Sequence, residues 1–224
     1  MAKPALPLAR GLGLILDLDG VIVDSMPIHV RAWREYLRRN GIVSEEIIRR
    51  MHGRKNEEIL RDFMGENAPP EEIFTHGAKK EQLYREMMEG QLENYLVPGL
   101  REFLDRAEGI PIAVASNAEQ ANVDFVLDGL GLRAHIAVAL DSSCVKLPKP
   151  SPDIYLRAAH ELGLPPQDCI VFEDSEVGVT AARKAAMRVV GILTGGIPLK
   201  EVDLAVANFA SPELEPWLAA QKTR

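Results

Sequence analysis

Two aspartates follow a short apolar run near the start of the chain. Asp17 and Asp19 stand on either side of Leu18 in the stretch "LILDLDG". Placing two carboxylates beside a buried strand costs desolvation and like-charge repulsion, unless a cation or a bound substrate compensates. One carboxylate could attack phosphorus as a nucleophile, while the other could serve as general acid and base. The pair therefore indicates a site that binds a cation or a substrate, and phosphoryl transfer is a reaction that these two carboxylates could catalyse.

Other polar residues stand where later apolar runs end. Ser116 and Asn117 follow one such run, and Glu173 and Asp174 end another. Lys149 lies between two prolines in the loop "VKLPKPSPDIY". Carboxylates from two strand ends can hold a hard cation such as Mg²⁺, which usually keeps room for waters and a substrate phosphate. A lysine and a hydroxyl at neighbouring strand ends would complete a phosphate pocket.

The elements that must position these residues are short strands alternating with helices. The apolar runs that predict strands are 12–17, 110–115, 135–140, 168–173 and 188–193. The helical patterns between the later runs are 98–108, 119–130, 151–163 and 175–186. This alternation predicts an α/β fold, a doubly wound (Rossmann-like) parallel sheet. Ligands of such sheets collect at the carboxyl ends of the strands, where the residues above stand.

One stretch breaks this rhythm. Residues 26–94 are rich in Glu, Arg, Lys and Met and show helical periodicity without a clear strand. We expect an inserted α-helical cap domain there, and a core domain formed by residues 1–25 and 95–224. Prolines and glycines near both borders suit chain turns or hinges.

Composition narrows the class of protein. The 224 residues are 46% hydrophobic and 26% charged, with a net charge of −7 and no long basic run. A nucleic-acid footprint is therefore missing, and no segment is typical of a signal peptide or a membrane span. The two cysteines, Cys144 and Cys169, lie in no metal-binding or disulfide pattern. We expect a cytoplasmic monomer that binds neither nucleic acid nor membrane.

Four stretches together resemble a known family. They occur in the order, and at roughly the spacing, of the four motifs of the haloacid dehalogenase superfamily: "DLDGVIVDS", "VASNA", "KPSPDIY" and "FEDSEVGVTAARKAAM". The match spans nearly the whole chain. It most resembles the branch with a helical cap inserted after the first motif, which contains β-phosphoglucomutase and many small sugar-phosphate phosphatases.

The resemblance assigns roles to the residues of these motifs. It implies that Asp17 is the nucleophile and Asp19 the general acid and base, and dehalogenases of the superfamily lack the second aspartate. It implies phosphate ligands at Ser116, Asn117 and Lys149. It implies a Mg²⁺ site formed by Asp17, Asp19, Glu173 and Asp174, with the backbone carbonyl of Asp19 as a further ligand. Phosphoryl transfer is therefore favoured over dehalogenation.

Three cap residues bear on the substrate. His29 is similar to a mutase histidine thought to keep the general acid out of reach until the cap closes. Asn56 stands where β-phosphoglucomutase carries an arginine that grips the distal phosphate, and Arg54 lies two residues earlier. The missing arginine favours a Mg²⁺-dependent phosphatase acting on a small phosphorylated metabolite, such as a sugar or polyol phosphate. The alternative is a β-phosphoglucomutase-like sugar phosphomutase. A phospho-ligand binding module would need a defect in the motifs, and none is evident.

Overall fold

The chain divides into two compact units. The computed structural model describes residues 4–42 and 56–223. One unit, called here the α/β unit, comprises Met1–Asp24 and Leu92–Arg224, and the other, the helical unit, comprises Ser25–Gln91. The helical unit overlaps most of the predicted insert at 26–94.

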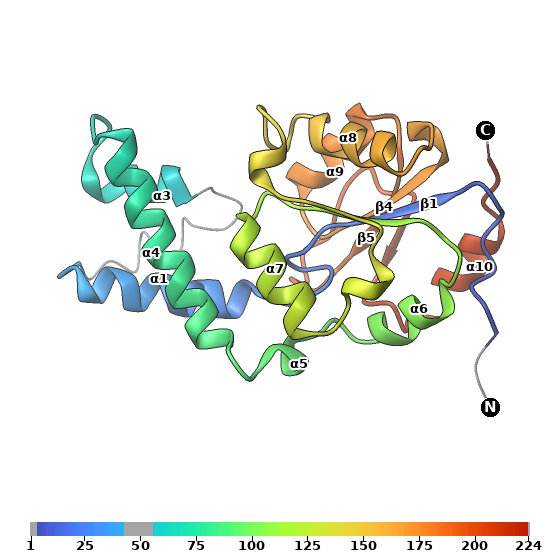
Figure 1. The fold of residues 1–224 in the computed structure, drawn as a ribbon, viewed down its shortest axis with the longest axis horizontal. Coiled ribbons are helices and arrows are strands. Elements are labelled where there is room, and N and C mark those ends of the chain that lie inside the picture. The colour runs from blue at the N-terminus through green and yellow to red at the C-terminus, as the bar shows by residue number, and fades with distance from the viewer. Residues whose placement is uncertain (1–3, 43–55, 224) are drawn as a thin grey trace. The chain divides into compact units, whose positions relative to one another are not determined.

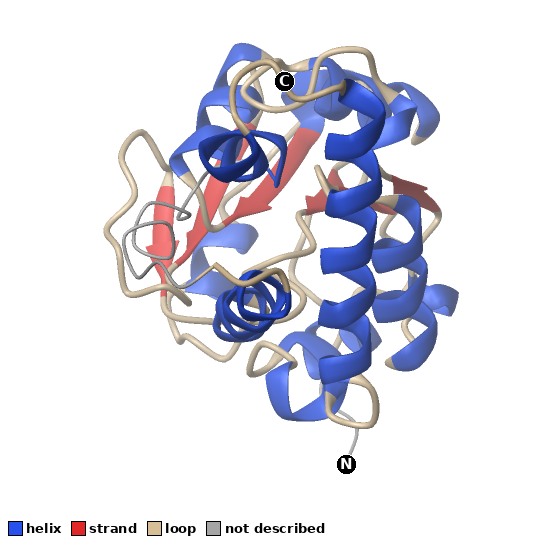
Figure 2. Ribbon diagram, turned by 90° about the vertical axis from the view of Figure 1, so that its left-hand side faces the viewer, coloured by secondary structure: helices blue, strands red, loops and turns tan. Residues whose placement is uncertain are grey.

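A single parallel sheet forms the centre of the α/β unit. Its six strands lie in the order β3-β2-β1-β4-β5-β6. Figure 2 draws the strands as red arrows. In chain order the strands are β1 (Gly13–Leu16), β2 (Ile112–Ala115), β3 (Val138–Leu140), β4 (Cys169–Glu173), β5 (Arg188–Ile192) and β6 (Leu204–Val206). All five neighbouring pairs are parallel. The predicted fold class is confirmed.

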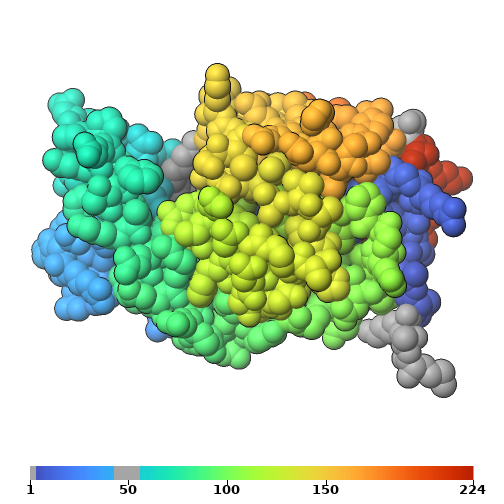
Figure 3. All heavy atoms as spheres, in the orientation of Figure 1, coloured from blue at the N-terminus to red at the C-terminus, as the bar shows by residue number. Residues whose placement is uncertain are grey.

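Helices cover both faces of this sheet. The helices of this unit are α5 (Leu92–Tyr95), α6 (Leu100–Arg106), α7 (Gln120–Gly129), α8 (Asp153–Glu161), α9 (Glu176–Lys184) and α10 (Leu214–Ala219). Short 3₁₀ turns occupy Arg133–His135, Ser142–Cys144 and Pro166–Asp168. Figure 1 shows α8 and α9 on one side of the sheet, with α6 and α10 on the other. Figure 3 shows atoms of α7 and α8, in yellow-green and orange, covering the nearer face of this unit.

Alternate strand residues explain the two faces. Ile15 and Val171 pack in one cluster with Tyr155 of α8 and Val179 of α9. Phe172, next along β4, turns to the other face, where its ring centroid lies 5.6 Å from that of Phe103 of α6. The central strands β1, β2, β4 and β5 are buried along their whole length. Their nearly continuous apolar sequences suit a parallel sheet that is covered on both sides.

The helical unit contains three described helices. They are α1 (Met26–Arg39), α3 (Asn56–Met64) and α4 (Pro70–Met88). Pro27 stands at the start of α1, where its missing N–H costs nothing. Arg38 and Arg39 stand in the last turn of α1, where cations oppose the negative end of the helix dipole. Across the described residues, every helix is too short or too polar to cross a bilayer.

Apart from α5, which spans the predicted border of the insert, two elements of the α/β unit were not expected from the sequence. All five predicted strands and all four predicted core helices are present, but β6 and α10 are additional. β6 has three residues and only its last one, Val206, is buried. Its apolar run, 204–207, has only four residues, too few to separate a strand from a helix or a loop by sequence alone.

Candidate active site

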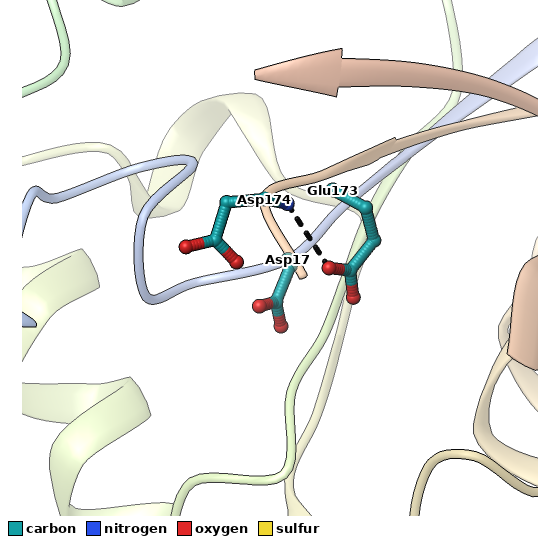
Figure 4. A group of neighbouring side chains, drawn as sticks. All are labelled: Asp17, Glu173 and Asp174. Carbon is teal, nitrogen blue, oxygen red and sulfur yellow. Dashed lines mark hydrogen bonds between the residues drawn. The ribbon is translucent and has the colours of Figure 1, made fainter. Parts of the chain in front are cut away.

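The carboxyl ends of β1 and β4 bring three acidic side chains together. Leu16 pairs with Phe172 in the sheet, and the backbone N–H of Asp17 donates to the carbonyl of Phe172 at 3.0 Å. This register sets Asp17 beside Glu173 and Asp174, as Figure 4 shows. One carboxylate oxygen from each of the three residues lies within 4.8 Å of the others. The sheet topology therefore brings together three of the four acidic residues predicted to hold the metal, and the carboxylate of Asp19 is not part of this group.

Lys149 places a positive charge inside this cluster. Its Nζ donates to Asp17 Oδ1 at 2.8 Å and to Glu173 Oε1 at 2.7 Å. The lysine is 3% exposed. Burial opposes its charge, but the carboxylates of Asp17 and Glu173 outweigh burial and raise the pKa of Lys149. The side chain is therefore a fixed ammonium at neutral pH.

The carboxylate of Glu173 is saturated with hydrogen bonds. Oε1 accepts from Lys149 Nζ and from the hydroxyl of Tyr155 at 2.6 Å. Oε2 accepts from the backbone N–H of Asp174 and from both the N–H and the hydroxyl of Ser175. Burial alone would raise the pKa of Glu173, but these donors and the charge of Lys149 lower it. A carboxylate offers about four lone-pair sites, so a further ligand would have to displace one of these donors.

The other two carboxylates lack such compensation. Burial raises the pKa of Asp17 to about 7, although Lys149 opposes the shift. Burial, followed by the charges of Glu173, Asp17 and Asp19, raises the pKa of Asp174 to about 9. Within residues 4–42 and 56–223, the carboxylate of Asp174 accepts no hydrogen bond. The ammonium of Lys149 lowers the pKa of Asp174, but burial and the neighbouring carboxylates outweigh it.

This electrostatic pattern fits a divalent cation. Asp17 and Asp174 are oxygen ligands of the kind that Mg²⁺ prefers, and a bound cation would offset the burial that raises both pKa values. Glu173 is close enough to be part of the same set, but its oxygens already hold Lys149 and the backbone. The residues present thus suit Mg²⁺ best at Asp17 and Asp174.

A glycine makes room for Asp174. Gly20 has a φ of +77°, a conformation that favours glycine, and its N–H donates to the carbonyl of Val23 at 2.7 Å. A Cβ at this position would overlap the carboxylate of Asp174. Asp19, one residue earlier, has a half-buried side chain whose charge raises the pKa of Asp174. The backbone of the loop after β1 therefore lies close to Asp174 at Gly20, and the same loop contains Asp19.

Ser116 and Asn117 follow β2 at the same edge of the sheet. Ser116 is buried, and its Oγ accepts from the N–H of Ala118 at 3.0 Å. That bond uses a lone pair of the hydroxyl and leaves its proton to donate. The side chain of Asn117 has a different task, because its Oδ1 accepts from the N–H of Lys149 at 3.1 Å. Asn117 thus holds the backbone of the lysine.

His29 and Asn56 belong to one buried polar cluster in the helical unit. Lys80 Nζ lies 2.7 Å from His29 Nδ1 and 2.8 Å from Glu81 Oε1, and the amide of Asn56 also donates to Glu81. An ammonium has no lone pair, so Nδ1 of His29 is the acceptor in its contact with Lys80. The ring of His29 stacks on Tyr84. Arg54, the third predicted cap residue, lies outside the described residues.

Sequence reasoning overlooked Lys80, Glu81, Tyr155 and Ser175. Tyr155 stands inside the quoted motif "KPSPDIY" and belongs to the buried residues of α8. A buried tyrosine hydroxyl normally has a hydrogen-bond partner, and this rule could have indicated that Tyr155 contacts a polar group of the site. Ser175 caps α9 through the N–H of Gly178. Lys80 and Glu81 are adjacent charges in a helix, which usually indicate a solvated surface.

Comparisons with known proteins agree with this geometry. A family model for haloacid dehalogenase-like hydrolases matches residues 13–186. The chain belongs to this family, as its four motifs predict, and it is a hydrolase by class.

The relatives come from the sugar-phosphate branch of the family. Hexitol phosphatase A of Escherichia coli is 34% identical, over 89% of this chain and 92% of its own. Fructose-1-phosphate phosphatase YqaB of the same organism is 32% identical, over 82% of this chain and 97% of its own. The crystal structure of β-phosphoglucomutase from Clostridium difficile superposes with a TM-score of 0.78 at 27% identity, covering 92% and 96% of the two chains.

Proposed function

We propose that this protein is a Mg²⁺-dependent phosphatase that hydrolyses a small sugar or polyol monophosphate through an aspartyl phosphate on Asp17. The observation that carries the proposal is the buried carboxylate of Asp17, held by the ammonium of Lys149 beside Asp174. Membership of the hydrolase family and relatives named as phosphatases support the class of phosphoric monoester hydrolase.

The first chemical step is displacement at phosphorus. A carboxylate oxygen of Asp17 attacks the phosphoryl group, the bond between phosphorus and the leaving oxygen breaks, and Asp19 gives that oxygen a proton. Lys149 favours the ionised form of Asp17 and places positive charge next to the phosphoryl oxygens. The hydroxyl of Ser116 is available to donate to the same oxygens.

The second step returns the enzyme to its starting state. Asp19, now ionised, takes a proton from water, and the resulting hydroxide attacks the phosphorus atom. The bond between phosphorus and Asp17 breaks, and inorganic phosphate leaves. Asp17 and Asp174 would hold Mg²⁺, which supplies charge neutralisation for the phosphoryl group in both steps.

A sugar phosphomutase is the second candidate. The pairing of His29 with Lys80 in the helical unit and 29% identity to β-phosphoglucomutase of Bacillus subtilis favour it. In that reaction a substrate hydroxyl, in place of water, would receive the phosphoryl group from Asp17. We propose that the helical unit acts as the cap that makes this choice and selects the substrate.

Products distinguish the two candidates. Purified protein is incubated with Mg²⁺ and a panel of hexose and hexitol phosphates, including β-glucose 1-phosphate with a bisphosphate activator. Release of inorganic phosphate from a few substrates supports the phosphatase, and isomerisation to glucose 6-phosphate with little free phosphate supports the mutase. If no substrate gives either product, both candidates are overturned. The cytoplasmic location and the monomeric state stay predictions from the sequence, and gel filtration tests the second.

A further inference from the structure

Tyr155 contacts both charged partners at the centre of the site. Its hydroxyl donates to Glu173 Oε1 at 2.6 Å, and its ring centroid lies 4.7 Å from Lys149 Nζ. The residue stands at the start of α8 and is completely buried. No step of the proposed reaction uses it.

Packing explains the ring of Tyr155 but not its hydroxyl. Ile154 and Ala158 share its buried helix and need no polar atom there. A phenylalanine would fill nearly the same volume without the cost of burying a hydroxyl. Packing therefore does not explain the hydroxyl, which donates to Oε1 of Glu173.

Sharing one acceptor affects where the ammonium lies. Glu173 Oε1 accepts from Tyr155 and from Lys149, so its negative charge is divided between two donors. Without the hydroxyl, Lys149 would be the only described donor on that oxygen, and the attraction between them would strengthen. The ammonium would then move toward Glu173 and away from Asp17 Oδ1.

We propose that Tyr155 is a positioning residue, whose hydroxyl shares Glu173 Oε1 with Lys149 and so keeps the ammonium on Asp17. The proposal rests on the proposed function, because it concerns the reaction in which Asp17 is the nucleophile. Misplacing a catalytic group by about 1 Å can cost up to roughly a hundredfold in rate. A partial displacement of Lys149 should therefore be measurable.

The first test is Tyr155→Phe, which removes only the oxygen. We expect kcat/KM for the best phosphate ester to fall roughly tenfold. Tyr95→Phe makes the same change in the half-buried side chain of α5, and it should leave kcat/KM within about twofold of wild type. A Tyr155→Phe rate within twofold of wild type would overturn the proposal.

A double-mutant cycle separates positioning from general loosening of the fold. If Tyr155 acts through Glu173, adding Tyr155→Phe to Glu173→Gln should change kcat/KM by less than about twofold. If the two effects multiply instead, the hydroxyl acts independently of Glu173 and the proposal is wrong.

A crystal structure of Tyr155→Phe decides the same question without activity. We expect Lys149 Nζ to lie farther from Asp17 Oδ1 than the 2.8 Å of the wild type. An unchanged distance overturns the positioning role. Because this readout needs no substrate, it still applies if the wild-type protein shows neither phosphatase nor mutase activity, which would overturn the proposed function by itself.

Discussion

Lys149 and Asp17 are 132 positions apart in the chain, yet 2.8 Å separates Nζ of the lysine from Oδ1 of the aspartate. Asp17 follows β1, whereas Lys149 lies in the loop between β3 and α8. Two features fix the pair: parallel strands that end at the same edge of the sheet, and Asn117, which binds the backbone N–H of Lys149. The charge pair is thus a product of topology, and its consequences can be tested one residue at a time.

Asp17→Asn should abolish turnover while the fold is kept. An amide oxygen is a poor nucleophile, and removing a nucleophile costs other hydrolases roughly 10⁴-fold or more in kcat. Stability should not suffer, because burial disfavours the charged form of Asp17 and raises its pKa. Steady-state kinetics and thermal unfolding check both parts, with the exposed Asp128→Asn of α7 as matched control. Turnover near the wild-type rate would show that Asp17 is not the nucleophile.

Asp174→Asn should weaken Mg²⁺ binding more than Glu173→Gln does. Asp174 accepts no hydrogen bond in the described chain, whereas both oxygens of Glu173 already have donors. We expect at least a ~10-fold rise in the Mg²⁺ dissociation constant for the Asp174 variant, since even indirect supports of metal sites cost ~10–100-fold. Isothermal titration calorimetry on metal-free protein measures it. A larger loss in Glu173→Gln would make Glu173 the principal ligand.

The metal-free protein should lose stability as the pH rises. Asp17 and Asp174 have folded-state pKa values of about 7 and about 9, above the usual 3.8. The folded state therefore binds more protons than the unfolded state between about pH 4 and pH 9, and the free energy of unfolding falls through that window. Thermal unfolding in EDTA should show a lower Tm at pH 8 than at pH 5.5. Mg²⁺ should raise the Tm more at pH 8 than at pH 5.5. In EDTA, the Tm of Asp174→Asn should change less with pH than that of the wild type. A wild-type Tm that does not change with pH in EDTA would contradict the raised pKa values of Asp17 and Asp174.

The sequence predicts the central architecture of this protein for a physical reason. Apolar runs such as residues 12–17 and 168–173 are too short for helices and too apolar for exposed strands, so they indicate a buried parallel sheet. Ligands of such sheets bind at the carboxyl ends of the strands, so the sequence alone predicts that Asp17, Glu173 and Asp174 lie close together. What each carboxylate does is harder to predict, because two of the donors to Glu173, Lys149 and Tyr155, come from distant parts of the chain that only packing brings to it.

The polar cluster of the helical unit shows the same limit. Residues 26–94 show helical periodicity, but adjacent charges such as Lys80 and Glu81 usually indicate a solvated helix surface. In the fold both are buried, and Lys80 lies over the rings of Trp33 and Tyr84. Contacts between α1 and α4 create this environment, and a single helix cannot reveal them.

Lys80→Met should destabilise the helical unit by about 3 kcal/mol, because it leaves the charge of Glu81 buried without its ammonium. Burial alone would raise the pKa of Glu81, but Lys80, followed by His29 and Asn56, lowers it to about 2. Adding Glu81→Leu should recover much of the loss, since a well-packed apolar pair can replace a buried ion pair. Urea unfolding of the two variants measures the difference. A double variant no more stable than Lys80→Met would count against a buried charge as the cause.

Gly178→Ala should damage the protein although the same change usually stabilises a helix. Gly178 lies in the first turn of α9, where a Cβ would overlap the carboxylate of Glu173 and force it off Lys149. Overpacking of this kind costs about 1–3 kcal/mol, and kcat/KM should fall because Lys149 loses one of the two carboxylates that position it. Gly77→Ala in α4 is the matched control, because its Cβ would meet Leu60 at an ordinary 3.7 Å. That variant should gain up to ~1 kcal/mol, and equal effects at both positions would mean that Glu173 does not occupy the space beside Gly178.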